Sequence, residues 1–348
     1  MTILANYFVS RSKEVTLISF DDGSIPPFYH LSAGVKHLSL GILGYSSNRW
    51  VGFWKNIQRI RILRKQIKRL SPDIIISFID LTNVLVILAA LGSALPVIVA
   101  EHSDPAMTSI GPFWRKLRLL AYPRASRIVV LNKKAKGYFA DRIQKKTRII
   151  PNPVFIGPDA CGSDEPFQTP TIVAMGRFSE EKGFDLLLKA FGLIKDQYPN
   201  WNLIILGDGP LRNELESLTT RLQLDQRVQF SGLVKQPHPL LRKAALFVLP
   251  SRFEGLPMAL LEAMACGLPA ISTEDHSGVR EIIEEGVNGL LVPPEDVKAL
   301  AAAMARLMGN EVERKRLAAR AGEVLNQFSV KRIGRQWEVL MEEAGNGR

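Results

Sequence analysis

The chain of 348 residues is long enough for two domains, and its 46% hydrophobic and 23% charged residues exclude a disordered or fibrous protein. Its two cysteines, Cys161 and Cys266, stand in no Cys-x-x-Cys or Cys/His motif, so they suggest neither a disulfide framework nor a zinc site and fit a reducing cytoplasm. Residues 1–155 contain 23 Lys and Arg against 8 Asp and Glu (+15), whereas residues 156–348 contain 22 against 26 (−4). The basic half is therefore expected to meet an anionic partner, for which nucleic acid, anionic lipid and a pyrophosphate-bearing acceptor are candidates.

Short apolar runs alternate with amphipathic stretches along the first half, a pattern typical of an α/β fold with a parallel sheet. The longest apolar run, residues 84–100, is interrupted by Gly92, Ser93 and Pro96, which indicates a buried helix, a turn and a strand rather than a membrane span. Prominent helices are expected over residues 51–70 and 113–122. The expected strands cover residues 14–20, 35–40, 73–78, 96–101, 127–131 and 147–150.

The segment 151–168, rich in Pro, Gly and Asp, indicates a linker, after which the alternation begins again. Three helices are expected to close the chain from Glu295 onward. The predicted domains are residues 1–155 and 156–328, with a last helix over 329–348 returning toward the first domain. Two such Rossmann-like halves would enclose a cleft, with ligands beyond the carboxyl ends of the strands. The strands of the second half are expected at residues 171–175, 202–206, 228–231, 246–249, 270–272 and 289–292.

Residues 250–262 read Pro-Ser-Arg-Phe-Glu-Gly-Leu-Pro-Met-Ala-Leu-Leu-Glu. They follow an expected strand and enter a helix with Pro257 in its first turn, and the start of that helix is a ready anion site. Glu254 and Glu262 are eight residues apart, ~12 Å along a helix, too far for the two acids of a glycosidase. We interpret them as binding opposite ends of a long polar ligand such as a nucleotide sugar. For either glutamate alone, the simpler interpretation is an exposed loop acid at Glu254 and a partner of a surface charge at Glu262.

Two further strand ends carry candidate ligands. Arg177 and Lys182, in Gly-Arg-Phe-Ser-Glu-Glu-Lys-Gly, follow a strand and can neutralise a departing diphosphate, while a solvated charge run explains them equally well. Gly207, in Leu-Gly-Asp-Gly-Pro, allows a ligand to approach the backbone, although a simple tight turn has the same composition. His102, in Glu101-His-Ser103, could hydrogen-bond a sugar hydroxyl or could be a histidine packed at the end of a strand.

The stretch 55–69 interleaves basic and apolar residues, and Phe-Trp-Arg-Lys at 113–116 adds Trp114 and Arg115. Such a helix can lie on an anionic membrane, although an ordinary solvated face has the same pattern. No nucleic-acid module is recognisable, so nucleic acid is not expected as a partner. The basic residues of the stretch are Lys55, Arg59, Arg61, Arg64, Lys65, Lys68 and Arg69.

Together these motifs resemble glycosyltransferase family 4, the large retaining group of GT-B fold, over essentially the whole chain. The resemblance implies that Glu254 contacts the donor sugar, Glu262 the ribose hydroxyls, and Arg177 and Lys182 the diphosphate. It also places His102 near the transferred sugar. Residues 151–153 resemble the hinge between the domains, and residues 278–281 and 286–289 resemble later structural turns. The phosphate-binding helix start is matched by Gly255 and the following Leu256, Pro257 and Met258.

Residues 77–83 and 101–103 resemble, more narrowly, bacterial N-acetylgalactosaminyltransferases that extend undecaprenyl-diphosphate-linked oligosaccharides. In that subgroup a basic helix of the first domain holds the lipid pyrophosphate, and residues 55–69 match it in place and character. The opening differs, because family members begin with a strand and a Gly-rich loop, whereas residues 1–8 already read as the first helix. We therefore expect the first domain to lack its opening strand. The hypothesis is an incomplete N-terminus, and the alternative is a weakened or inactive product.

The resemblance implies a retaining transfer from a nucleotide diphosphate sugar, with UDP-N-acetylhexosamine as the expected donor, by front-face substitution. The acceptor would be membrane-associated: an undecaprenyl-diphosphate oligosaccharide, or a lipopolysaccharide or exopolysaccharide precursor. The enzyme would act in the cytoplasm, peripherally on the inner face of the membrane. No cofactor and no metal are expected, since no clear cluster of metal-binding acids is present. The alternatives are a nucleotide-sugar epimerase of GT-B fold and a non-catalytic relative.

Overall fold

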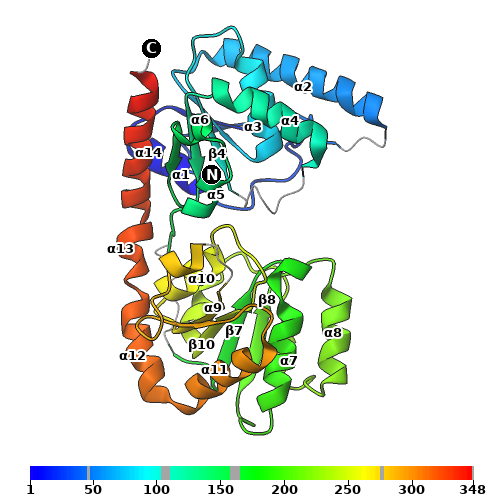
Figure 1. Cartoon of the computed structure of the whole chain (residues 1–348), viewed down its shortest axis with the longest axis vertical. Coiled ribbons are helices and arrows are strands. Elements are labelled where there is room, and N and C mark those ends of the chain that lie inside the picture. Colours follow the sequence, from blue (N-terminus) through cyan, green and yellow to red (C-terminus); the bar gives the residue numbers. More distant parts are fainter. Residues whose placement is uncertain (45–47, 103–109, 157–164, 275–277, 347–348) are drawn as a thin grey trace. The chain divides into compact units, whose positions relative to one another are not determined.

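The computed structural model describes residues 1–44, 48–102, 110–156, 165–274 and 278–346 (Figure 1). Ser103 and Cys161 lie outside these residues. The chain divides into two compact units, which are Met1–Pro153 together with Val330–Arg348, and Val154–Ser329. Both units are built from parallel strands and helices, which gives the α/β architecture predicted from the sequence.

The first unit contains two parallel sheets in its described residues. One has the order β1-β2 and the other the order β3-β4-β5-β6. Within the described residues, neither the second edge of β1 nor the second edge of β3 is paired, so the strands of this unit form a split sheet. The predicted strands are all present: β1 (Val15–Ser19), β2 (Val35–Ser39), β3 (Ile75–Phe78), β4 (Val97–Glu101), β5 (Arg127–Val130) and β6 (Thr147–Ile149).

Helices cover both faces of the four-stranded sheet. On one face Val97, Val99 and Ile128 pack with α2, α3 and α4, while on the other Ile98 and Val129 pack with α1 and α14. This alternation follows from the strand period of two, and burial on both faces is typical of parallel sheets. The helices of the unit are α1 (Thr2–Ser10), α2 (Arg49–Leu70), α3 (Asp80–Ala90), α4 (Gly111–Ala121), α5 (Lys133–Gly137), α6 (Asp141–Gln144) and α14 (Val330–Gly345).

The second unit has one parallel sheet of order β12-β11-β10-β7-β8-β9. The helices α7, α8 and α11 share one core with alternate strand residues such as Ile172 and Ala174. The buried residues of α10, which packs against β10 and β11, lie outside that core, so α10 covers the opposite face. The predicted strands are present as β7 (Thr171–Met175), β8 (Asn202–Leu206), β9 (Val228–Phe230), β10 (Leu246–Leu249), β11 (Ala270–Thr273) and β12 (Leu290–Val292).

The helical end of the chain differs from the prediction. Four helices follow Glu295 in the described residues, not three, because α12 ends before Gly322 and an extended Ser329 separates α13 from α14. None of the helices that the structure describes is both long and apolar enough to span a bilayer. The helices of the second unit are α7 (Phe184–Ile194), α8 (Arg212–Arg221), α9 (His238–Lys243), α10 (Met258–Ala265), α11 (Val297–Gly309), α12 (Glu311–Ala321) and α13 (Val324–Phe328).

Candidate functional site

The loops that follow β7 and β10 meet at the carboxyl edge of the second sheet, because these two strands are neighbours in it. Gly183 closes the first loop with a φ of +64°, and a Cβ placed on it would lie 2.1 Å from the carbonyl oxygen of Pro250. Only glycine combines this left-handed backbone with so close an approach. The packing of the two loops therefore requires glycine at position 183.

Lys182 and Glu254 form an ion pair across this contact. The Lys182 ammonium donates to Glu254 Oε1 at 2.7 Å, and the side chains are 22% and 9% exposed. The hydroxyl of Ser251 donates to the same oxygen at 2.7 Å. The structure thus brings together two of the residues singled out in the sequence and fixes the carboxylate from two sides. Arg177 lies earlier on the Lys182 loop, where it is exposed.

The helix α10 begins at Met258, with Pro257 at its N-cap. The sequence suggested that Pro257 lies in the first turn of the helix, whereas the structure places it just before that turn. Glu254 therefore precedes the helix and does not lie on it. The ~12 Å separation predicted for Glu254 and Glu262 does not apply, because it assumed one continuous helix. Gly255 and Leu256 belong to the connecting turn, while Glu262 is half-buried within α10. Burial raises the pKa of Glu262 to about 7.

Gly207 allows a close approach, and the partner is the neighbouring loop. Its φ is +141°, and a Cβ there would lie 1.9 Å from the carbonyl oxygen of Gly176. A Cβ placed on Gly209 would likewise lie 2.5 Å from the carbonyl oxygen of Phe178. These two glycines let the loop after β8 pack on the loop that carries Arg177. The packing of the two loops alone therefore explains why glycine occupies positions 207 and 209.

His102 belongs to the first unit and follows β4. Its ring packs edge-on against Phe78, with ring centres 5.0 Å apart, and burial lowers its pKa to about 4. The imidazole is therefore neutral at pH 7 and can both donate and accept a hydrogen bond. The preceding Glu101 is 1% exposed, accepts a hydrogen bond from the Tyr122 hydroxyl and lies 3.7 Å from Arg118.

The basic side chains of α2 divide into two groups. Arg59 donates to the carbonyl oxygens of Ile42 and Gly44, and Arg64 donates to those of Leu88 and Ala89 at the end of α3. These two arginines hold α2 to its own unit.

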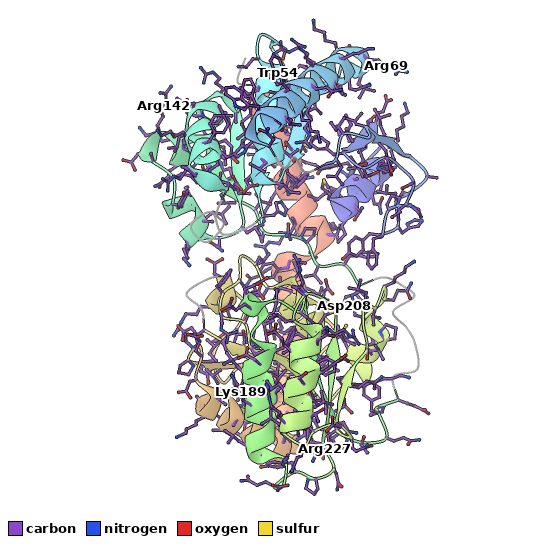
Figure 2. All side chains as sticks on the ribbon, turned by 90° about the vertical axis from the view of Figure 1, so that its right-hand side faces the viewer. Trp54, Arg69, Arg142, Lys189, Asp208 and Arg227 are labelled. Carbon is purple, nitrogen blue, oxygen red and sulfur yellow. The ribbon has the colours of Figure 1, made fainter. Side chains whose placement is uncertain are left out.

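The second group on α2 is exposed, as Arg64 also is. Arg61, Lys65 and Lys68 are spaced by four and three residues, so they share one helix face. Trp54, which is 62% exposed and seven residues before Arg61, falls on the same face. Figure 2 shows Trp54 and Arg69 toward opposite ends of the helix. Lys55, among the predicted contacts, is half-buried.

The other predicted contacts of the first unit lie on α4. Trp114 is partly buried against the core of the unit, while the following Arg115 is exposed. Of the two, Arg115 is therefore the more exposed side chain.

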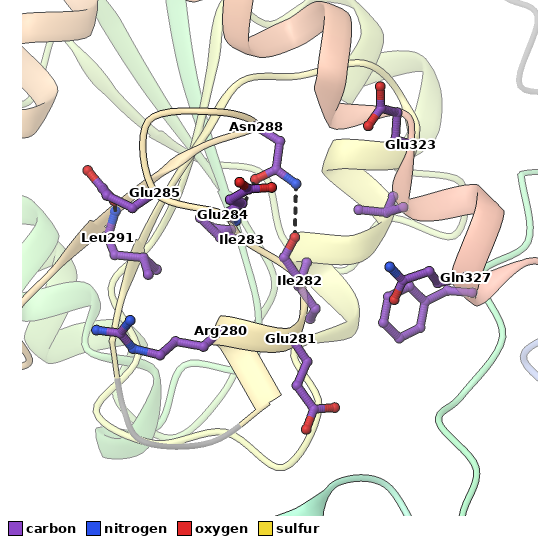
Figure 3. Close-up of a pocket in the computed structure, with 12 residues that line it drawn as sticks. Arg280, Glu281, Ile282, Ile283, Glu284, Glu285, Asn288, Leu291, Glu323 and Gln327 are labelled. Atoms are coloured by element: carbon purple, nitrogen blue, oxygen red, sulfur yellow. Dashed lines mark hydrogen bonds between the residues drawn. The ribbon is translucent and has the colours of Figure 1, made fainter.

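Two cavities of the second unit lie apart from these residues. One of about 510 Å³ is formed by the turn around Asn288 and by α13 (Figure 3). Asn288 donates to the carbonyl oxygen of Ile282 at 3.0 Å and closes this turn. The other, of about 730 Å³, borders β9. Neither is lined by Lys182, Glu254 or Glu262, and no group of three metal-ligating side chains occurs among the described residues.

Sequence reasoning missed the residues that support the ion pair. Ser251 stands three residues before Glu254, and a hydroxyl at that spacing in a turn is a weak signal that it bonds the carboxylate. Arg252 and Asp185, which join the same two loops, are 67 residues apart. No local pattern links residues at that separation.

Two family models and several relatives match this chain. The model described as Glycosyltransferase Family 4 matches residues 1–156, and the one described as Glycosyl transferases group 1 matches residues 163–324. The chain is 32% identical over 348 residues to the GalNAc-alpha-(1->4)-GalNAc-alpha-(1->3)-diNAcBac-PP-undecaprenol alpha-1,4-N-acetyl-D-galactosaminyltransferase of Campylobacter jejuni, and the match covers 99% of this chain and 94% of that protein.

Solved structures with the same fold include sucrose-phosphate synthase from Thermosynechococcus elongatus. It has a TM-score of 0.84 at 20% identity and covers 99% of this chain and 92% of its own. Anabaena Alr3699/HepE in complex with UDP-glucose has a TM-score of 0.72 at 20% identity, with 89% and 86% covered. At this level of identity, the likeness shows a shared two-domain GT-B fold.

Proposed function

Because this chain belongs to glycosyltransferase family 4, we propose that it moves a sugar, with retention, from a nucleotide diphosphate sugar to a membrane-associated glycan acceptor. The observation that carries the proposal is the Lys182–Glu254 pair at the carboxyl ends of two adjacent strands, just before α10 begins. Ligands of open parallel sheets bind at this edge. A cation, a carboxylate and a helix start together suit a phosphorylated sugar.

The donor is proposed to be a UDP sugar, namely a UDP-N-acetylhexosamine. Anabaena HepE was solved with UDP-glucose, and the Campylobacter relative is named as an N-acetylgalactosaminyltransferase. Glu262 would accept hydrogen bonds from the ribose hydroxyls, and Glu254 would contact the sugar. The amides at the start of α10, from Gly255 through Met258 (Pro257 has none), would face the phosphates.

The chemistry follows from the charges at this edge. A lysine ammonium has three donors, and Glu254 takes one, which leaves Lys182 able to bind phosphate oxygens. As the bond between the anomeric carbon and the diphosphate breaks, Lys182, Arg177 and the α10 amides would stabilise the negative charge that develops. The acceptor oxygen would bond to the same face of the carbon, and its proton would pass to the departing diphosphate. Neutral His102 would hydrogen-bond a hydroxyl of the transferred sugar.

No metal is required in this scheme, because fixed cations and amides balance the diphosphate charge. Activity is therefore expected to be unchanged in EDTA and unchanged after magnesium is restored. A rate that falls in EDTA and returns with magnesium would contradict this part of the proposal.

The acceptor is proposed to approach the basic face of α2. Arg61, Lys65 and Lys68 are exposed together, with Trp54 on the same face. Basic residues attract anionic lipid or a lipid pyrophosphate, and tryptophan prefers the membrane interface. The acceptor class is an undecaprenyl-diphosphate oligosaccharide or another polysaccharide precursor, met at the inner face of the cytoplasmic membrane.

The test is a screen of nucleotide sugars against the full chain by thermal shift. It is followed by incubation of the best donor with and without lipid-pyrophosphate oligosaccharides, with NMR of the product. Transfer that keeps the anomeric configuration supports the proposal, and inversion contradicts it. Isomerised donor formed without acceptor would favour the epimerase.

A further inference from the structure

We propose that Arg252 is a positioning residue that holds the Lys182 loop and the Glu254 loop in register for the donor. The inference rests on the proposed function, because it concerns the same site. Arg252 stands two residues before Glu254, and its contacts are with residues of two other loops. It would act through Lys182 and Glu254 without touching the substrate.

The guanidinium of Arg252 makes a bidentate contact with Asp185. Its Nη1 lies 2.9 Å from Oδ1 and its Nη2 lies 3.1 Å from Oδ2. The Nη1 group also donates to the carbonyl oxygen of Glu180 at 2.7 Å. The backbone amide of Arg252 donates to the carbonyl oxygen of Glu181 at 2.8 Å. One residue thus binds a carboxylate and two carbonyl groups of the segment that carries Lys182.

These contacts flank the ion pair. Asp185 lies in the first turn of α7, three residues after Lys182, and the contact of Gly183 with Pro250 lies between them. Lysine has a long flexible side chain, so its ammonium is placed reliably only if its backbone is fixed. The Arg252 contacts supply that fixation, since they join the two loops independently of Lys182.

A third loop joins the same guanidinium. The Arg252 Nε donates to Glu295 Oε1 at 3.0 Å. Glu295 precedes α11 and has a φ of +58°, a conformation that residues with a side chain rarely adopt and that persists only where the surroundings hold it. The hydrogen bond from Arg252 is therefore one of the contacts that hold Glu295 in this conformation.

The Arg252–Asp185 pair differs from an ordinary surface ion pair, which contributes little. The Arg252 side chain is 22% exposed, and its planar fork matches the carboxylate in a way that lysine cannot reproduce. Although burial raises the pKa of Asp185, hydrogen bonds from Arg252 and Lys189 lower it overall. Arg306 offers a matched control, because it contacts Glu313 through two nitrogens in the same unit and its side chain is 52% exposed.

The experiment uses the full chain. Binding of UDP, GDP and ADP is measured by calorimetry, and the tightest of the three is used as the probe for R252Q, R252K and the control R306Q. We expect R252Q and R252K to weaken binding about tenfold, within the range found for residues of one hydrogen-bond network, and R306Q to change it less than twofold. Adding R252Q to K182A should cause little further loss, because the two act through one contact.

The outcomes separate the two proposals. If none of the three nucleotides binds the unaltered protein, the proposed function is overturned, and this inference with it. If the probe binds and R252Q resembles R306Q, or if the R252Q and K182A losses are additive, only the role of Arg252 is overturned. Should R252Q fail to fold, D185N replaces it, because that change removes the charge of the bidentate acceptor while the arginine remains.

Discussion

The ammonium of Lys182 lies 2.7 Å from Oε1 of Glu254, although the two residues are 72 positions apart in the chain. Each follows its own strand, and the contact exists because β7 and β10 are neighbours. The pairing places one positive and one negative group at the edge where a parallel sheet receives its ligand. Because their charges are opposite, we expect Lys182 to act on the diphosphate of the donor and Glu254 to act on its sugar.

Replacing Glu254 with glutamine should lower kcat about 100-fold and leave the fold intact. The glutamine oxygen can still accept the hydrogen bonds of Lys182 and Ser251, but it lacks the negative charge that would act on the donor sugar. Steady-state kinetics and thermal unfolding of the same preparation measure the two effects.

A matched control for Glu254 is the glutamate of another ion pair. Glu311 pairs with Lys315 at 2.7 Å on the exposed side of α12, so E311Q also removes one charged partner and should leave kcat unchanged. Equal rates for E254Q and the unaltered protein would show that the Glu254 carboxylate takes no part in turnover.

Replacing Gly183 with alanine should separate the two loops. The methyl group would meet the carbonyl oxygen of Pro250 at 2.1 Å, and the left-handed backbone alone costs about 1–2 kcal/mol for a residue with a Cβ. Gly286→Ala isolates the backbone cost, since its φ is +71° and nothing lies within 4 Å of its added Cβ. Urea unfolding should show a larger loss for G183A than for G286A, and nucleotide binding should weaken for G183A alone. Equal losses would mean that the close approach is unimportant.

The strands were predictable because each is a short apolar run set off by polar or turn residues, which is a local property of the sequence. The run Val97-Ile-Val-Ala-Glu101 is an example, and it forms β4 as expected. The start of α10 was misplaced by a small number of residues, since Pro257 is compatible with both the N-cap and the first turn. Helix ends depend on caps and packing as much as on composition.

The contacts of the site depend on strand order, which a single sequence does not contain. Lys182 and Glu254 were singled out separately, and only the neighbouring positions of β7 and β10 bring them together. The same limit applies to α2, where Arg59 and Arg61 look alike in the sequence. Arg59 turns to carbonyl groups of its own unit because residues 42–44 pass beside it.

Glu262 should make stability depend on pH. Burial raises its pKa from 4.5 to about 7, so between these values the folded protein holds a proton that the unfolded chain has lost. The free energy of unfolding contributed by Glu262 is therefore present below pH 4.5 and falls as the pH rises through about 7. Relative to E262Q, the unaltered protein should lose up to about 3 kcal/mol between pH 4.5 and 8. Urea titrations at these pH values test this, and parallel curves for the two proteins would contradict it.

The same residue should make nucleotide binding tighten with pH. An ionised Glu262 accepts hydrogen bonds from both ribose hydroxyls, whereas a protonated one accepts fewer. Calorimetry with UDP should therefore show affinity rising from pH 6 to pH 8, and E262A should bind at least about tenfold more weakly at pH 8, as expected for a lost hydrogen bond to a charged group. UDP affinity that is the same in E262A would remove the ribose role.

The exposed face of α2 can be separated from its structural arginines. The triple change R61Q/K65Q/K68Q should weaken binding to phosphatidylglycerol vesicles about 100-fold, because each basic residue near an anionic surface contributes ~1 kcal/mol. Its unfolding temperature should hardly change, since all three side chains are exposed. R64Q should instead lower the free energy of unfolding by about 1 kcal/mol, because Arg64 donates hydrogen bonds to the carbonyl oxygens of Leu88 and Ala89. It should keep most of its binding to the vesicles. Vesicle sedimentation in low and high salt distinguishes the two variants, and undiminished binding by the triple variant would show that this face does not meet the lipid.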